Sequence, residues 1–367
     1  MNGRANDFES LVNRRDLLAL AGATAILASS PAMARAGKRD GVAETLADLV
    51  EREYPDPLLA RAIATGIRRE MRSNRYSMTD PQAFAAALTA DLRKPGHDEH
   101  LKVTYDPKDA AMRTSAKAAP APANPPSPKT PSLRAKAVFG PQGYGVIKAE
   151  LLEGNIGLLR IDNFVPLYDL VKERIGHAID LLSDSWAMIL DLRHNGGGTS
   201  DTPAYLLSYF FDRPPFLLNR MVWRRQPEER IETTRNIIGP SYGESRPLIA
   251  AISSETFSAA EAVAYSLQST KRATIVGQTT RGGANPGDFF DIGQGFVAFC
   301  PQGQAVDAVT GRNWEGTGVI PDVPTSPQDI LRIAHCTAVQ KALAQAKDSD
   351  AISQLKGALK SGPYIEG

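Results

Sequence analysis

Two short segments, apolar at nearly every position, constrain the fold of this chain more than any other feature. They run from Trp186 to Leu190 and from Pro247 to Ile252, and each is followed by a loop and then by a helical pattern. Strands without polar positions are typical of a parallel sheet that helices cover on both faces. We therefore expect an α/β fold, whose reactive groups lie in loops at the carboxyl ends of the strands.

The neighbouring sequence extends this pattern into a larger sheet. Residues 155–164 have the composition of a strand, and residues 167–182 repeat apolar side chains at helical spacing. With the strand at 186–190, its glycine-rich loop and a helix at about 200–211, they form a β-α-β frame. Further strands are predicted at 216–238 (as a pair), 273–276 and 295–300, and a final helix follows Ser326-Pro327.

Differences in composition divide the chain into five regions. Residues 37–104 carry three short helical patterns, too small for a core of their own, and are expected to pack on the next domain. Residues 105–135 contain an Ala/Pro-rich run without apolar periodicity, which predicts a linker or a disordered insertion. The α/β domain is expected at 136–347 and a tail at 348–367, while residues 1–36 precede the helical unit.

The first 36 residues have the order of an export signal. Arg14-Arg15 precede an apolar run from Leu17 to Ala28, and the stretch from Ala32 to Ala36 offers Ala-x-Ala cleavage sites. The run is about 12 residues long, too short to span a bilayer stably. The paired arginines resemble a twin-arginine signal, which implies a folded protein exported to a bacterial periplasm, with no stable membrane span after removal of the signal. The alternative is a membrane anchor that is never cleaved.

Charge and cysteine content exclude several classes of function. The net charge of +1 gives no electrostatic basis for binding nucleic acid. Cys300 and Cys336 match no zinc or redox spacing, although a disulfide between them in an oxidising compartment stays open. The cluster from His97 to His100 lacks the spacing of a zinc-binding helix, so neither a metal nor an organic cofactor is predicted. No particular oligomeric state follows from the sequence.

Ser258 is the candidate nucleophile. It stands in the hexapeptide Thr256–Glu261, between the buried strand at 247–252 and a helical pattern. At that position, the helix dipole and the free N–H groups can stabilise an oxyanion. The alternative is a capping box, in which Ser258 only caps the helix and Glu261 bonds back to it.

Three consecutive glycines, Gly196 to Gly198, follow the strand at 186–190. Backbone N–H groups without side chains can approach a ligand closely. Neither of the glycine patterns that bind nucleotide phosphates is present. Two interpretations of this loop remain: it supplies half of an oxyanion hole, or it is an ordinary turn. A second glycine-rich loop runs from Gly277 to Pro286.

Four segments match the motifs of one enzyme family in the order in which the family has them. They are Asp98–His100, Asp191–Gly198, Thr256–Glu261 with Val276–Ala284, and Glu315–Asp322. In these segments the chain resembles the C-terminal processing peptidases, a family that includes tail-specific proteases, the core of tricorn protease and the interphotoreceptor retinoid-binding protein repeats. The resemblance covers most of residues 41–345 and implies a crotonase-like β-β-α core with a small N-terminal helical subdomain.

The resemblance implies one of two catalytic arrangements, and the chain fits the tricorn-like one. Tail-specific proteases pair the serine with a lysine 25 residues later, a position that is Gly283 here, and Lys271 is a poor substitute. The tricorn-like pattern uses a histidine from the N-terminal part and a late glutamate, which His100 and Glu315 match. The serine that precedes the histidine in that pattern is Glu99 in this chain.

These matches assign a role to each site residue. His100 takes the proton of Ser258 and returns it to the leaving amine, and Glu315 orients the site and favours the imidazolium. The N–H of Ala259 and that of Gly196 or Gly197 hold the oxyanion. Gly282, Gly283 and Arg281 are assigned to substrate binding.

Three residues compete for these roles. His194 and, less so, His97 are rival bases, and Arg193 is a rival for a substrate carboxylate. For both Arg193 and Arg281 a structural ion pair is the alternative.

The sequence therefore predicts an exported serine peptidase that acts on peptides or protein tails. A non-catalytic binder of apolar ligands or peptides is the alternative from another class, because retinoid-binding relatives share the fold and fold does not determine function. A further alternative is a scaffold protein of the cell envelope that has lost catalytic turnover.

Overall fold

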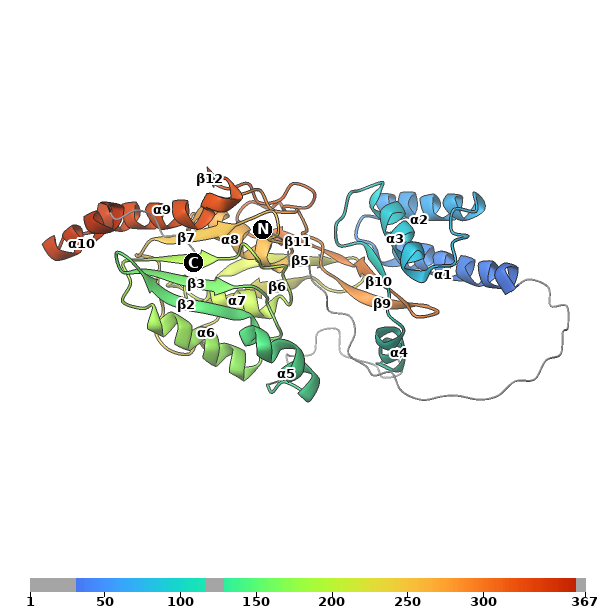
Figure 1. The fold of residues 1–367 in the computed structure, drawn as a ribbon, viewed down its shortest axis with the longest axis horizontal. Helices are drawn as coiled ribbons and strands as arrows, with labels where there is room; N and C mark the ends of the chain where they lie inside the picture. The colour runs from blue at the N-terminus through green and yellow to red at the C-terminus, as the bar shows by residue number, and fades with distance from the viewer. Residues whose placement is uncertain (1–30, 117–128, 361–367) are drawn as a thin grey trace, which may run out of the picture.

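The computed structural model describes residues 31–116 and 129–360, which form an α/β body and a smaller helical unit joined by a short sheet (Figure 1). The helices of the described residues are α1 Pro31–Glu53, α2 Pro57–Arg72, α3 Pro81–Arg93, α4 Pro107–Ala116, α5 Leu133–Phe139, α6 Asp169–Leu181, α7 Asp201–Leu207, α8 Ala259–Ser269, α9 Ile330–Gln345 and α10 Ser349–Lys360, with 3-10 turns at Gly140–Gly145 and Pro327–Asp329.

A six-stranded sheet forms the centre of the α/β body, in the order β12-β8-β7-β4-β3-β2. All neighbouring strands are parallel except β2, which runs antiparallel to β3. The strands are β2 Val146–Leu152, β3 Ile156–Ile161, β4 Ala187–Asp191, β7 Leu248–Ile252, β8 Thr274–Gly277 and β12 Val323–Pro324. The predicted α/β class is confirmed, and β4 and β7 are the two apolar runs.

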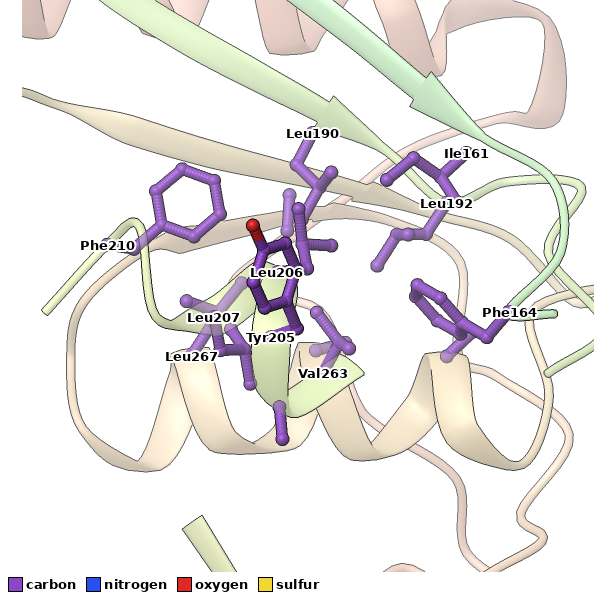
Figure 2. Close-up of a cluster of buried hydrophobic side chains, with 14 of the residues drawn as sticks. Ile161, Phe164, Leu190, Leu192, Tyr205, Leu206, Leu207, Phe210, Val263 and Leu267 are labelled. Atoms are coloured by element: carbon purple, nitrogen blue, oxygen red, sulfur yellow. The ribbon is translucent and has the colours of Figure 1, made fainter. Parts of the chain in front are cut away.

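Helices cover both faces of this sheet, which explains why its strands have so few polar positions. In β4, Met188 and Leu190 face the cluster with α6, α7 and α8, whereas Ala187 and Ile189 face the cluster with α9 and α10. Figure 2 shows how Leu206 and Leu207 of α7 pack with α8 residues against the sheet. This packing fixes the start of α8 next to the carboxyl end of β7.

The helical unit completes its core with a hairpin from the α/β part of the chain. The hairpin strands are β9 Gly287–Gly293 and β10 Phe296–Pro301, and β10 pairs with β1 Lys102–Tyr105. Side chains of β9 and β10, among them Phe296 and Ala298, join the apolar cluster of α1, α2 and α3. The expectation that the three helices pack on the following domain is confirmed, and β1 holds the preceding loop against that domain.

Short polar residues set the starts of two of these helices. The Asp56 carboxylate accepts the N–H groups of Leu58 and Leu59 at the start of α2, and that of Asp80 accepts the N–H of Ala83 at the start of α3. Proline occupies the first turn of both helices, where it loses no hydrogen bond. Asp80 and Pro81 together thus define the start of α3.

A third sheet has the order β11-β5-β6 and lies beside α8. It consists of β5 Leu217–Trp223, β6 Glu229–Glu232 and β11 Gly303–Asp307. The predicted strand pair at 216–238 corresponds to β5 and β6, which are antiparallel.

Two regions contain more structure than their composition indicates. The expected linker at 105–135 includes α4 and the start of α5, and residues 117–128 lie outside the described residues. The expected tail at 348–367 includes α10, whose buried Ala351, Leu355 and Ala358 lie on one helix face. This short apolar stripe packs on α9, so the stretch expected as a tail includes a helix.

Most of the expected export signal, residues 1–30, lies outside the described residues. The expected Ala-x-Ala sites fall in the first turns of α1, which begins at Pro31. Among the described residues, no helix combines the length and the apolar character needed to cross a membrane.

Both cysteines are free thiols. Cys300 is buried in the cluster of the helical unit, and Cys336 lies on α9 at the far side of the central sheet. The disulfide that the sequence left open is not formed.

Candidate active site

Ser258 lies at the junction between the central sheet and α8. Its φ of 55° and ψ of −119° are unusual for a residue with a side chain, and a capping residue normally has extended backbone. Such strain persists only where surrounding contacts enforce it, and it is frequent at active sites. One of these contacts is the hydrogen bond from the Ser258 N–H to Glu261 Oε2, at 2.8 Å.

The imidazole of His100 reaches Ser258 from the helical unit. His100 Nε2 is 3.0 Å from Ser258 Oγ, although the two residues are 158 positions apart in the chain. The ring lies between those of Phe257, with centroids 4.5 Å apart, and Phe299, with centroids 5.7 Å apart. Only 8% of the side chain is exposed, so the imidazole is held in a largely dry position.

Two carboxyl groups lie close to the imidazole, those of Asp98 and Glu315. Asp98, His100 and Glu315 each present a nitrogen or oxygen atom within 4.8 Å of those of the other two. Asp98 Oδ1 is 3.7 Å from His100 Nδ1 and accepts the His100 backbone N–H at 2.9 Å. Glu315 Oε2 accepts the N–H of Ala284 at 2.6 Å. The structure thus brings together the predicted Ser258, His100 and Glu315, and adds Asp98.

The two carboxyl groups have opposite pKa shifts. Burial, and next the negative charge of Asp98, raise the pKa of Glu315 to about 8, against a weaker opposing effect of the Ala284 N–H. Burial also acts to raise the pKa of Asp98, but hydrogen bonds from His100 and Asn285 outweigh it and the pKa is lowered. These opposite shifts make Asp98 the more acidic member of the pair.

Asp98, His100 and Glu315 are close enough together to hold a metal ion, and no other group of His, Cys, Asp or Glu side chains among the described residues is. The Asp98 oxygens already accept hydrogen bonds from Tyr54 Oη, the His100 N–H and Asn285 Nδ2. We therefore assign no metal to this group.

Glu261 links the serine to the second glycine-rich loop. Its side chain is fully buried and accepts, besides the Ser258 N–H, those of Gly282 at 2.7 Å and Gly283 at 2.8 Å, and the Thr280 hydroxyl. Burial raises the pKa of Glu261 in spite of these donors. The half of the capping box that Glu261 supplies is present, and it also positions the loop beside His100.

The first glycine-rich loop packs against the serine. A Cβ on Gly197 would lie 2.9 Å from Ser258 Cβ and 3.1 Å from the Ala259 nitrogen, so only glycine fits. The Gly197 N–H donates to Asn195 Oδ1 at 2.8 Å, which corrects its assignment as an oxyanion donor. Among the described residues, the N–H groups of Ala259 and Gly196 have no such partner, and Gly196 lines the groove.

The predicted substrate-binding residues separate into two kinds. Gly282 is buried, and its carbonyl accepts the Gly316 N–H, which indicates a structural role. Gly283 and Arg281 line the groove beside Ser258, and the Arg281 guanidinium lies 4.2 Å above the Phe257 ring and 3.6 Å from Glu99. The structural assignment of Gly282 corrects the expectation that it contacts substrate.

The competing residues lie away from the Ser258 hydroxyl. His194 is exposed and its Nδ1 pairs with Glu255 at 3.0 Å, and His97 is exposed in the loop before Asp98. Arg193 forms a buried ion pair with Asp191 at 2.9 Å. Lys271 follows the carboxyl end of α8, the end opposite Ser258.

An open groove of about 1460 Å³ passes over the site, between the helical unit and the α/β body. Its lining includes small and apolar side chains of the α/β body, among them Ala259, Ala262, Ala284, Ala305, Met221 and Trp314. Its lining also includes residues of α3 and β1, and Phe289 of β9. This volume exceeds the roughly 300–1,000 Å³ of a typical small-molecule site, so the groove has room for a peptide.

Sequence reasoning did not assign a role to Asp98, Tyr54 or Asn285. Asp98 stands two positions before His100 in a segment that the sequence already marked, so its proximity was a usable signal. Tyr54 and Asn285 are 44 and 187 positions from Asp98. Asn285 lies in the second glycine-rich loop, but nothing in the sequence marks either residue as a partner of Asp98.

Two family sequence models match the chain. The model of peptidase family S41 matches residues 155–325. That of the N-terminal domain of S41 peptidases in eukaryotic IRBP matches residues 18–140.

Solved structures have the same fold at low sequence identity. A lipoprotein from Streptococcus agalactiae is 19% identical, with a TM-score of 0.51 over 82% of this chain and 95% of that one. A putative peptidase from Parabacteroides merdae is 14% identical, with a TM-score of 0.55 over 84% and 97%. Mature CPAF complexed with lactacystin is 14% identical, with a TM-score of 0.52 over 88% and 99%.

Proposed function

This chain belongs to peptidase family S41, and on that premise we propose that it is a serine peptidase with Ser258 as nucleophile and His100 as base. The 3.0 Å contact between Ser258 Oγ and His100 Nε2 is the observation that carries the proposal. This distance is within the reach that a general base needs, and the strained backbone at Ser258 is of the kind that active sites hold.

The proposed reaction follows from this geometry. Ser258 Oγ attacks the peptide carbonyl carbon while its proton passes to His100 Nε2. The oxyanion that forms is held by the N–H groups of Ala259 and Gly196, and the dipole of α8 favours its charge. The carbonyl reforms as the C–N bond breaks, and His100 gives the proton to the leaving amine. Water, activated by His100, then hydrolyses the acyl ester and restores Ser258.

The substrate is proposed to be a peptide or a protein segment that lies extended in the groove. The apolar wall around Ala262 and Met221 favours a non-polar side chain next to the cleaved bond. Arg281, partly exposed at the rim, is proposed to bind a carboxylate of the substrate.

A fluorophosphonate probe tests the proposal, because it reacts only with an activated serine. We expect labelling of the wild-type protein and none of Ser258→Ala, with hydrolysis of a casein-derived peptide pool lost in parallel. Ser326→Ala, at a remote serine whose hydroxyl bonds to Asp329, should be labelled like the wild type. Absence of labelling in the wild type would instead support the non-catalytic binder.

Two histidine variants test the base. His100→Ala should lower the labelling rate by about 10²- to 10⁴-fold, the usual effect of losing a general base. His194→Ala is the matched control, since His194 is exposed and pairs with Glu255 rather than with Ser258. Equal losses in both variants would contradict the assignment of His100.

We also propose that residues 1 to about 36 direct export to a bacterial periplasm, on the order of charged, apolar and small residues in that segment.

A further inference from the structure

Asp98, His100 and Glu315 share one buried space on the side of the imidazole away from Ser258. When His100 becomes an imidazolium during the reaction, the charge that faces it there determines how easily it takes the proton. The family pattern assigns this role to the late glutamate. The hydrogen bonds of the two carboxyl groups point to a different assignment.

The surroundings of Asp98 suit an ionised carboxylate. The residue is 0% exposed. Its three partners, Tyr54 Oη at 3.0 Å, Asn285 Nδ2 at 2.9 Å and the His100 N–H at 2.9 Å, are all donors to it. A protonated Asp98 would have to place its own O–H among these donors, which would leave a buried donor without an acceptor.

The surroundings of Glu315 suit a neutral carboxylic acid. Oε2 accepts the Ala284 N–H, and the Asn285 N–H also acts to lower the pKa of the carboxyl group, whereas the buried Oε1 has no hydrogen-bond partner among the described residues. Two carboxylates within 4.8 Å of each other in a buried space do not both ionise readily. Oε1 is therefore the oxygen that can carry a proton.

We propose that Asp98 is the anion that stabilises protonated His100, and that Glu315 is protonated in the resting protein. Asp98 is thus a positioning residue. Its Oδ1 fixes the His100 backbone and also lies 3.7 Å from the ring Nδ1. The proposal rests on the proposed function for its catalytic meaning, but the charge arrangement itself is independent of turnover.

Other ionisable groups near His100 do not replace this charge. Glu261 is held by the N–H groups of Ser258 and the second glycine-rich loop. Glu99 points to the groove rim, where it pairs with Arg93 at 2.9 Å and lies 3.6 Å from Arg281. Tyr54, which follows α1, donates its hydroxyl to Asp98, and the rings of Phe257 and Phe299 contact the imidazole.

The test is an NMR titration of histidine side chains in the full chain, in the presence of EDTA. The chain has five histidines, and His100→Gln identifies the resonance of His100. The variants compared are Asp98→Asn and Glu315→Gln, both neutral and close in shape to the native residues. Asp98→Asn should fold, because a rotation of the Asn285 amide presents its unpaired Oδ1 to the new amide.

Asp91→Asn is the matched control. Asp91 is also buried in the helical unit, and its Oδ2 also accepts a tyrosine hydroxyl, that of Tyr76 at 3.0 Å. It pairs with Arg75 and is not part of the catalytic site. A purely structural effect of losing a buried aspartate would thus appear in Asp91→Asn as well.

We expect Asp98→Asn to move the titration midpoint of His100 to lower pH by about one unit or more, the effect of removing an adjacent opposite charge. Glu315→Gln, which replaces one neutral group by another, should move it by less than about half a unit. The acidic limb of the pH profile of kcat/KM should shift in the same way. Asp91→Asn, the control, should shift neither the titration midpoint of His100 nor the acidic limb of the pH profile.

A shift of the His100 midpoint to lower pH by about one unit or more in Glu315→Gln would overturn the proposal, and this result decides the matter even if Asp98→Asn does not fold. A wild-type protein that lacks Ser258-dependent labelling would refute the proposed peptidase function only. The NMR titration would still decide which carboxyl group carries the charge.

Discussion

At the scale of single residues, Gly283 lies so close to His100 that a side chain at position 283 would collide with the imidazole. A Cβ on Gly283 would lie 2.6 Å from His100 Cε1 and 2.3 Å from the Phe257 ring. The position that holds lysine in the Ser–Lys arrangement is therefore closed here by the imidazole. A serine–histidine site at this location requires a residue without a side chain at 283.

Gly283→Ala should displace His100 from Ser258 and lower the rate of fluorophosphonate labelling by about 10²-fold, as expected for a misplacement of about 1 Å. The backbone of Gly283 does not have a positive φ, so the effect is steric rather than conformational. Gly66→Ala in α2 is the control, because a Cβ there meets no atom within 4 Å and alanine favours a helix. Normal labelling of Gly283→Ala would show that His100 does not need its present position.

At the residue scale, the sequence marked the segments whose side chains lie together in the structure, while their catalytic roles stay a prediction. Ser258, His100 and Glu315 each belong to a segment that the resemblance marked, and the structure brings them together. The N–H of Gly197 could not be excluded as a donor in advance, because its bond to Asn195 depends on the shape of one turn. Which of Asp98 and Glu315 is ionised likewise depends on how deeply each carboxyl group is buried, and the spacing of residues in the sequence does not give this.

At the scale of secondary-structure elements, the start of α8 and the second glycine-rich loop form one unit through Glu261. Its carboxyl group accepts the N–H groups of Ser258, Gly282 and Gly283 in the interior of the protein. The capping box predicted from the sequence is only part of this role. The strained conformation of Ser258 is kept by the same contacts.

Glu261→Gln should reduce the free energy of unfolding by about 3 kcal/mol, because the new amide N–H groups would face buried donors. Labelling of Ser258 should fall as well, since the Ser258 N–H loses a charged acceptor. Chemical denaturation and probe kinetics measure the two effects. Glu255→Gln, at an exposed glutamate three positions before Ser258, should change neither, and an unaltered stability of Glu261→Gln would argue against this role.

The elements that the sequence predicted best are those buried on both faces. β4 and β7 lack exposed positions, so their apolar runs were unambiguous. β2 and β9 were not predicted, because most of their residues are only partly buried and give no clear alternation. Helix α4 lies in a stretch whose few apolar residues show no helical stripe, and its contacts with β9 are tertiary.

At the scale of the whole molecule, the site exists only when two parts of the chain have folded together. His100 and Asp98 precede β1, which pairs with β10 of the hairpin, while Ser258 and Glu315 belong to the α/β body. The cores on the two sides are separate apolar clusters. Activity therefore reports on correct docking of the helical unit, and transport of an already folded chain would preserve that docking.

The export proposal predicts where active protein accumulates in a bacterial host with a twin-arginine pathway. Replacing both Arg14 and Arg15 by lysine should retain the labelled protein in the cytoplasm, since that pathway reads the arginine pair. Arg4→Lys, which changes another arginine before the apolar run, is the control and should be exported normally. Fractionation followed by fluorophosphonate labelling measures both location and folding. Because the probe needs an assembled Ser258–His100 pair, labelled protein in the cytoplasm of the double variant would show that the chain folds before transport. Periplasmic labelling in that variant would refute the twin-arginine route.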